Sequence, residues 1–194
     1  MIIGAAVLAG GKSLRMGINK AELKLNGITV IEKILSELKS FDEIVISAES
    51  DKMYGCNAVV YSDILKNRGP AGGIYTVLSK CRSEALFVTA CDMPMIKNDT
   101  VKRFCMLFDD SYDACVLKIG GMVEPLFAVY KKKTAEHFEK AIKNGSYSLK
   151  QIISDLNIKY IDISKISCNE TEFLNMNTPE DYLRVVEISR ENQS

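Results

Sequence analysis

The stretch Leu8-Ala9-Gly10-Gly11-Lys12-Ser13-Leu14-Arg15-Met16-Gly17-Ile18-Asn19-Lys20 begins at the last residue of a continuous apolar run, residues 2–8. Such a run is typical of a strand buried on both faces of a parallel sheet. The loop after the strand then lies at the carboxyl edge of the sheet, where open α/β proteins bind their ligands. The sequence therefore predicts a glycine-rich loop at a binding edge.

Two familiar phosphate-binding motifs do not fit this loop. A Walker P-loop aligned on Gly11-Lys12-Ser13 requires a glycine at Ala6, inside the strand, and the adjacent glycines break the dinucleotide fingerprint. What remains is a bare backbone that can approach phosphate oxygens, with Arg15 and Lys20 adding positive charge. By composition alone a solvated connection is an equally good interpretation, and both stay open at this point.

Strands and helices alternate along the rest of the chain. Thr29 with Glu32 predicts a capping box at one helix start, and Thr178 with Pro179 predicts the start of the last helix. The alternation predicts an α/β fold with helices on both faces of the sheet. We expect one domain over residues 1–194, with a loose tail from about residue 191. The expected later strands are residues 44–48, 58–61, 85–89, 114–117, 126–130 and 160–163.

Composition excludes several classes of protein. The 25 Lys and Arg residues balance 25 Asp and Glu residues, whereas a nucleic-acid-binding protein normally carries a basic excess. The single histidine, His137, excludes a zinc site that needs two histidines, and the six cysteines form no C-x-x-C pair. The start lacks the positive region of a signal peptide, and no apolar run approaches the ~20 residues that span a bilayer. We expect a cytoplasmic protein with no nucleic-acid or membrane partner.

Other candidate site residues lie at the expected carboxyl edge. Asp92 follows a buried strand and suits Mg²⁺, although an aspartate before a proline is often only a turn residue. Asp63 could cap a turn or accept hydrogen bonds from a base or sugar. In an extended Asn175-Met176-Asn177 both asparagines point to one side, although N-cap chemistry also explains them.

Taken together, these motifs resemble the molybdenum cofactor guanylyltransferase (MobA-like) family of nucleotidyltransferases. The opening loop resembles the signature L-[AS]-G-G-x-S-x-R-M-G-x-x-K of these enzymes. The resemblance continues in order through Asp63, Gly69-Pro70-Ala71-Gly72-Gly73, Cys91-Asp92-Met93-Pro94, Glu124-Pro125-Leu126-Phe127-Ala128 and Asn175-x-Asn177-Thr178-Pro179-Glu180-Asp181.

The resemblance implies a Rossmann-like three-layer α/β/α enzyme with a mostly parallel central sheet. It would transfer GMP from Mg-GTP to the terminal phosphate of molybdopterin, releasing pyrophosphate, and would contact molybdoenzyme maturation proteins transiently. Catalysis is expected at Arg15, Lys20 and Asp92. Mg²⁺ is expected at Asp92 and Asn177. The nucleotide-binding residues implied are Leu8, Ala9, Gly10, Gly11, Gly17, Lys20, Asp63, Gly69, Gly73, Asn175 and Asn177.

Guanine preference depends on two positions. Cytidylyl-transferring relatives resemble L-A-A-G, with alanine at the position of Gly10, and glycine there leaves room for a purine. Asp63 can accept hydrogen bonds from guanine N1–H and the exocyclic amine. Glu49 stands where the family usually has asparagine, so the base is less defined than the reaction. The alternatives are a related enzyme using CTP or a sugar-phosphate acceptor, and a nucleotide-binding regulator without turnover.

Overall fold

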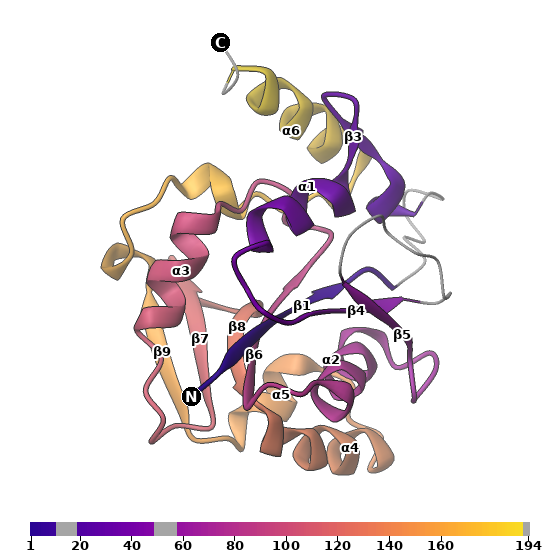
Figure 1. The fold of residues 1–194 in the computed structure, drawn as a ribbon, viewed down its shortest axis with the longest axis vertical. Coiled ribbons are helices and arrows are strands. Elements are labelled where there is room, and N and C mark those ends of the chain that lie inside the picture. Colours follow the sequence, from indigo (N-terminus) through magenta and orange to yellow (C-terminus); the bar gives the residue numbers. More distant parts are fainter. Residues whose placement is uncertain (11–18, 49–57, 192–194) are drawn as a thin grey trace.

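A computed structural model describes residues 1–10, 19–48 and 58–191 of the chain. Figure 1 shows a central sheet with helices packed on both of its faces, as the alternating pattern predicted. The strands are β1 (Ile3–Leu8), β2 (Lys24–Leu25), β3 (Ile28–Thr29), β4 (Ile44–Ala48), β5 (Val59–Ser62), β6 (Ala85–Ala90), β7 (Ala114–Ile119), β8 (Met122–Lys131) and β9 (Ile158–Asp162). The helices are α1 (Val30–Leu38), α2 (Gly69–Lys80), α3 (Asn98–Met106), α4 (Ala135–Lys143), α5 (Leu149–Ser154) and α6 (Pro179–Glu191).

The main sheet has seven strands in the order β5-β4-β1-β6-β8-β7-β9. Strands β5, β4, β1 and β6 run parallel, and β9 runs parallel to β7. Only β8 is antiparallel to its neighbours, β6 and β7. The expected mostly parallel sheet is confirmed. The carboxyl ends of β1, β4, β5, β6 and β7 therefore share one edge with the amino end of β8.

Each face of the sheet has its own apolar core. Helices α1, α3 and α6 cover one face, where Phe87, Phe104, Phe127 and Phe173 form edge-to-face ring contacts. Helices α2, α4 and α5 cover the other face, around Tyr130 and the apolar side of α2. Strands buried on both sides explain why their sequences are continuous apolar runs rather than alternating ones.

Local signals placed the helix starts correctly. Thr29 and Glu32 form the predicted capping box of α1, and the backbone N–H of Asp181 donates to Thr178 Oγ1 at the start of α6. A small hairpin, β2–β3, turns at Asn26-Gly27, and both of these residues have positive φ. The amide of Asn26 donates to Ser189 in α6, so the last helix is tied to this hairpin (Figure 1).

The structure departs from the expected boundaries at β8. The strand was expected from residue 126, whereas it begins at Met122 and includes Glu124 and Pro125. Its register with β7 shifts between Val116 and Leu117, which marks a bulge. A proline is tolerated in a sheet at such an irregularity because it has no N–H to donate to the ladder.

Candidate active site

The end of β1 is anchored between two neighbouring strands. The backbone N–H of Ala9 donates to the carbonyl of Ser47 at 2.8 Å, and the N–H of Cys91 donates to the carbonyl of Leu8 at 3.2 Å. Leu8 and Ala9 are buried, whereas Gly10 is exposed. The first residues of the glycine-rich loop are thus held rigidly at the carboxyl edge, with Gly10 open to a ligand.

Helix α2 approaches this point through its glycines. A Cβ on Gly73 would lie 3.0 Å from Ser47 Oγ and 3.1 Å from a methyl carbon of Leu8, so glycine allows this close packing without displacing either side chain. Gly69 begins the helix with φ of +57°, a backbone conformation that favours glycine. The first turn of α2 contains no acidic residue. Its positive dipole end therefore remains available to an anion at the same edge.

Asp63 follows β5 at this edge. Its carboxylate accepts a 2.5 Å hydrogen bond from the hydroxyl of the buried Ser47. Ser47 lies in β4, so the aspartate is oriented by the neighbouring strand. Ser47 is also paired with Leu8 of β1, so this oriented carboxylate lies near the end of β1 and can accept hydrogen bonds from N–H donors of a ligand.

Asp92 lies just beyond β6, in the centre of the sheet. Its carbonyl accepts from the N–H of Met176 at 2.7 Å, which fixes the C-terminal segment against it. Its Oδ1 atom is shielded from solvent and has no hydrogen-bond partner among the described residues. Burial raises the pKa of Asp92, and the nearby Lys20 opposes this shift. A shielded carboxylate oxygen without a partner needs a ligand that supplies positive charge.

The two asparagines come to this aspartate from a distant part of the chain. Met176 is buried, whereas Asn175 and Asn177 are exposed on the opposite side, as expected for an extended segment. Lys20 Nζ donates to Asn177 Oδ1 at 2.8 Å across 157 positions of sequence. Lys20, Asp92 and Asn177 are therefore brought to one place at the carboxyl edge.

One residue of this edge was missed from the sequence. Glu124 lies in β8 at this edge, where Asp92, Asn175 and the backbone N–H of Leu126 all influence the pKa of its carboxyl group. Burial and the charge of Asp92 raise the pKa of Glu124, and Leu126, Lys150 and Asn175 oppose this shift. Its signal in the sequence is an acidic residue followed by a proline beside an apolar strand.

Four candidate site residues lie outside the described part of the structure. They are Gly11, Arg15 and Gly17 of the glycine-rich loop, and Glu49 after β4. Among the described residues, no group of three or more His, Cys, Asp or Glu side chains forms a metal cage. Mg²⁺ does not require one, because it keeps several waters and takes one or two carboxylates plus substrate phosphates. Asp92, with an amide oxygen such as that of Asn177, fits this kind of site.

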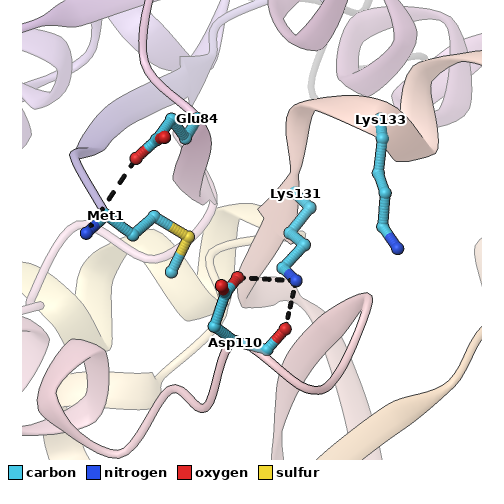
Figure 2. Close-up of a pocket in the computed structure, with 5 residues that line it drawn as sticks. All are labelled: Met1, Glu84, Asp110, Lys131 and Lys133. Carbon is cyan, nitrogen blue, oxygen red and sulfur yellow. Dashed lines mark hydrogen bonds and ion pairs between the residues drawn. The ribbon is translucent and has the colours of Figure 1, made fainter.

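The opposite edge of the sheet contains a pocket of a different kind. Figure 2 shows this pocket of about 300 Å³, lined by Met1, Glu84, Asp110, Lys131 and Lys133. Lys131 pairs with Asp110 at 2.6 Å, and the terminal ammonium lies 3.9 Å from Glu84. Charges that neutralise one another in this way leave little attraction for a charged ligand.

The fold and the carboxyl-edge site together define a nucleotidyltransferase of the Rossmann-like α/β class. The MobA-like NTP transferase domain matches residues 5–159, and the chain belongs to this family. No helix in the described ranges is both long and apolar enough to cross a membrane.

Two relatives and one solved structure illustrate the similarity. A "Probable molybdenum cofactor guanylyltransferase" of Carboxydothermus hydrogenoformans is 34% identical over 187 residues, covering 94% of each chain. A protein of the same description from Peptoclostridium acidaminophilum is 32% identical, covering 96% of this chain and 90% of that one. The crystal structure of molybdopterin-guanine dinucleotide biosynthesis protein A from Archaeoglobus fulgidus has a TM-score of 0.82 at 28% identity, covering 98% of this chain and 100% of the other.

Proposed function

We propose that this protein transfers GMP from Mg-GTP to the terminal phosphate of molybdopterin and releases pyrophosphate. The observation that carries the proposal is the grouping at the carboxyl edge: Asp92 with a shielded, unpartnered oxygen, beside the Lys20–Asn177 pair. The descriptions of the relatives support the choice of nucleotide and acceptor.

Asp92 and Asn177 would hold Mg²⁺. Bound there, Mg²⁺ supplies charge stabilisation to the phosphates during in-line displacement. The shielded Oδ1 atom supports this assignment because the fold provides it with no internal donor among the described residues. Asn177 is exposed, and its Oδ1 atom is oriented by the hydrogen bond from Lys20, so this amide oxygen is available as a second oxygen ligand.

Lys20 would stabilise the leaving pyrophosphate. Its ammonium group is held at the site by a neutral amide and forms no ion pair with a carboxylate in the described part of the chain, so its charge remains available to phosphate oxygens. Arg15 is proposed to bind the β- and γ-phosphates from the preceding loop. Such fixed positive charge acts where negative charge develops in the transition state.

The nucleotide base would lie against Leu8, Ala9 and Gly10, with Asp63 accepting from the guanine edge. Gly11, Gly17, Gly69 and Gly73 would complete the nucleotide site through their backbone. No histidine base is needed, because the attacking phosphate of the acceptor is already an anion. His137 is engaged elsewhere, with its Nε2 atom 2.7 Å from the carbonyl of Ile152.

We also propose that residues 1–194 form a single nucleotidyltransferase domain. The contact of Met176 with Asp92 supports this, because it makes the segment after residue 159 part of the site. We also propose a cytoplasmic location, because GTP is supplied there.

The test is pyrophosphate release with molybdopterin, Mg²⁺ and each NTP in turn. We expect turnover with GTP, and the largest rise in Tm with GTP among the four nucleotides in Mg²⁺. Turnover with CTP but not GTP would reject the guanylyl assignment. Tight GTP binding without pyrophosphate release, in the presence of molybdopterin, would instead identify a regulator.

A further inference from the structure

Two segments far apart in the sequence lie side by side in the fold. One contains Lys20 and the β2–β3 hairpin, and the other contains Asn177 and α6 (Figure 1). Three pairs of residues join them by hydrogen bonds, at separations of 157, 158 and 163 positions. Because these separations are nearly equal, the two segments run alongside each other in the same direction. The contact between Lys20 and Asn177, inside the proposed active site, is the first of the three.

The second contact joins the hairpin to the first turn of α6. The hydroxyl of Tyr182 donates to the backbone carbonyl of Lys24 at 2.8 Å. Lys24 begins β2, a few residues after Lys20. Ala21, between the two lysines, is fully buried in the core that also contacts Tyr182. The backbone that carries Lys20 is therefore held both by the core and by α6.

The third contact attaches the turn of the hairpin to the end of α6. The side-chain amide of Asn26 donates to the carbonyl of Ser189 at 3.0 Å and to its hydroxyl at 2.9 Å. Ser189 is buried, and Leu25, beside Asn26, is buried in the same core as Val185 of α6. Both ends of α6 therefore hold the hairpin, so it cannot slide along the helix without breaking these contacts.

The first turn of α6 also orients Asn177. The carboxylate of Asp181 accepts hydrogen bonds from the backbone N–H groups of Asn177 and Thr178, each at 2.9 Å. Asp181 and Tyr182 are adjacent, so a single turn of helix fixes both partners of the Lys20–Asn177 contact. A lysine side chain is long and flexible, and an anchored backbone reduces the positions that its ammonium group can take.

We propose that the attachment of the β2–β3 hairpin to α6 positions Lys20 for the transfer reaction, with Tyr182 and Asn26 as positioning residues. The inference rests on the proposed function. Neither residue needs to touch the substrate, because both act through the backbone of the hairpin. A cation held in place stabilises the charge that develops on the leaving pyrophosphate without first having to be ordered. Loss of the attachment should therefore lower kcat more than it weakens substrate binding.

The decisive variant is Tyr182→Phe, which removes the hydroxyl but keeps the ring that packs against the core. We expect kcat for pyrophosphate release to fall about 5-fold, as for the loss of one hydrogen bond, with KM for GTP and for molybdopterin within about twofold of wild type. Tyr160→Phe, on the edge strand β9, is the matched control and should change none of these constants. A wild-type kcat in Tyr182→Phe would overturn the proposal.

A double substitution separates positioning of Lys20 from a general structural role. No ammonium group remains to be positioned in Lys20→Met, so adding Tyr182→Phe should lower the single-turnover rate no further. A second fall of about 5-fold in this background would show that Tyr182 does not act through Lys20, and would overturn the proposal.

Asn26→Gly tests the attachment at the other end of α6 without changing the helix. Glycine tolerates the positive φ of 51° at this turn but has no amide to donate to Ser189. We expect the same pattern as for Tyr182→Phe, a lower kcat with little change in either KM, because both residues hold the same hairpin. A wild-type kcat in Asn26→Gly would contradict the proposal.

The two proposals fail in different ways. Absence of pyrophosphate release from the wild type with GTP and molybdopterin would reject the proposed function, and with it the inference that depends on it. Normal turnover by the wild type together with unchanged kcat in Tyr182→Phe would reject the inference alone.

Discussion

The two edges of the central sheet differ in whether their acidic side chains have partners within the protein. Acidic side chains at the amino edge have partners within the protein: Asp113 pairs with Lys133 at 2.6 Å. Asp110 pairs with Lys131, as Figure 2 shows. Glu43 accepts 2.7 Å hydrogen bonds from the backbone N–H groups of Arg82 and Ser83. At the carboxyl edge, Asp92 keeps an oxygen without a partner among the described residues.

The difference indicates what each edge does. Paired charges at the amino edge stabilise the loops that lead into the strands. Unpaired or neutrally held charges at the carboxyl edge are unfavourable in the free protein and become favourable when a ligand completes them. Substitutions at the two edges should therefore have different effects: loss of activity at one edge and loss of stability at the other.

The largest effect is expected from Asp92→Asn. Turnover should fall on the order of 1,000-fold, because Asn cannot supply the negative charge that Mg²⁺ needs. The fold should be retained, and Tm without Mg²⁺ should not decrease, because the variant removes a charge that burial disfavours. Steady-state pyrophosphate release and thermal melts with and without Mg²⁺ measure both quantities. Full activity in this variant would remove Asp92 from the mechanism.

Glu43→Gln should show the reverse pattern. The free energy of unfolding should fall by about 2 kcal/mol, because two backbone N–H groups lose a charged acceptor. Activity of the folded fraction should not change. The measurement is urea denaturation together with kcat, and Glu84→Gln, at a side chain that is 65% exposed, is the control. A large fall in kcat with unchanged stability would contradict the separation of the two edges.

The contribution of Glu43 should also depend on pH. Burial raises its pKa, but hydrogen bonds from Ser83 and Arg82 outweigh this, and the net pKa is lowered from the model-compound value of 4.5. A lowered native pKa means that the stabilisation is complete above the unfolded pKa and is lost as pH falls through the native pKa. The stability difference between wild type and Glu43→Gln should thus be largest near neutral pH and shrink below pH 4.5.

The smallest effect is expected from Lys133→Met. Its pair with Asp113 is largely solvated, with the lysine side chain 65% exposed. Exposed pairs of this kind contribute about 0.5 kcal/mol or less, and salt screens them. Urea denaturation at low and high salt should differ little between this variant and wild type, and turnover should be the same. A loss of activity would indicate that the amino-edge pocket takes part in catalysis.

Much of the fold was predictable because its signals are local. The apolar run that became β1 and the capping box of α1 each depend on residues within a few positions of one another. The glycine-rich loop and Asp92 were predictable for a related reason, since each directly follows a buried strand. The bulge of β8 was not, because Pro125 interrupts the apolar pattern and the compensating hydrogen bond comes from the buried hydroxyl of Tyr130.

The sequence alone determined the class of fold, the position of the binding loop and the acidic residue at the centre of the edge, because strand and helix patterns act over short distances. The tertiary structure decided which of these residues meet. Lys20 contacts Asn177 only because the C-terminal segment returns to Asp92 at the end of β6. Such contacts join segments far apart in the chain, and no local pattern encodes them.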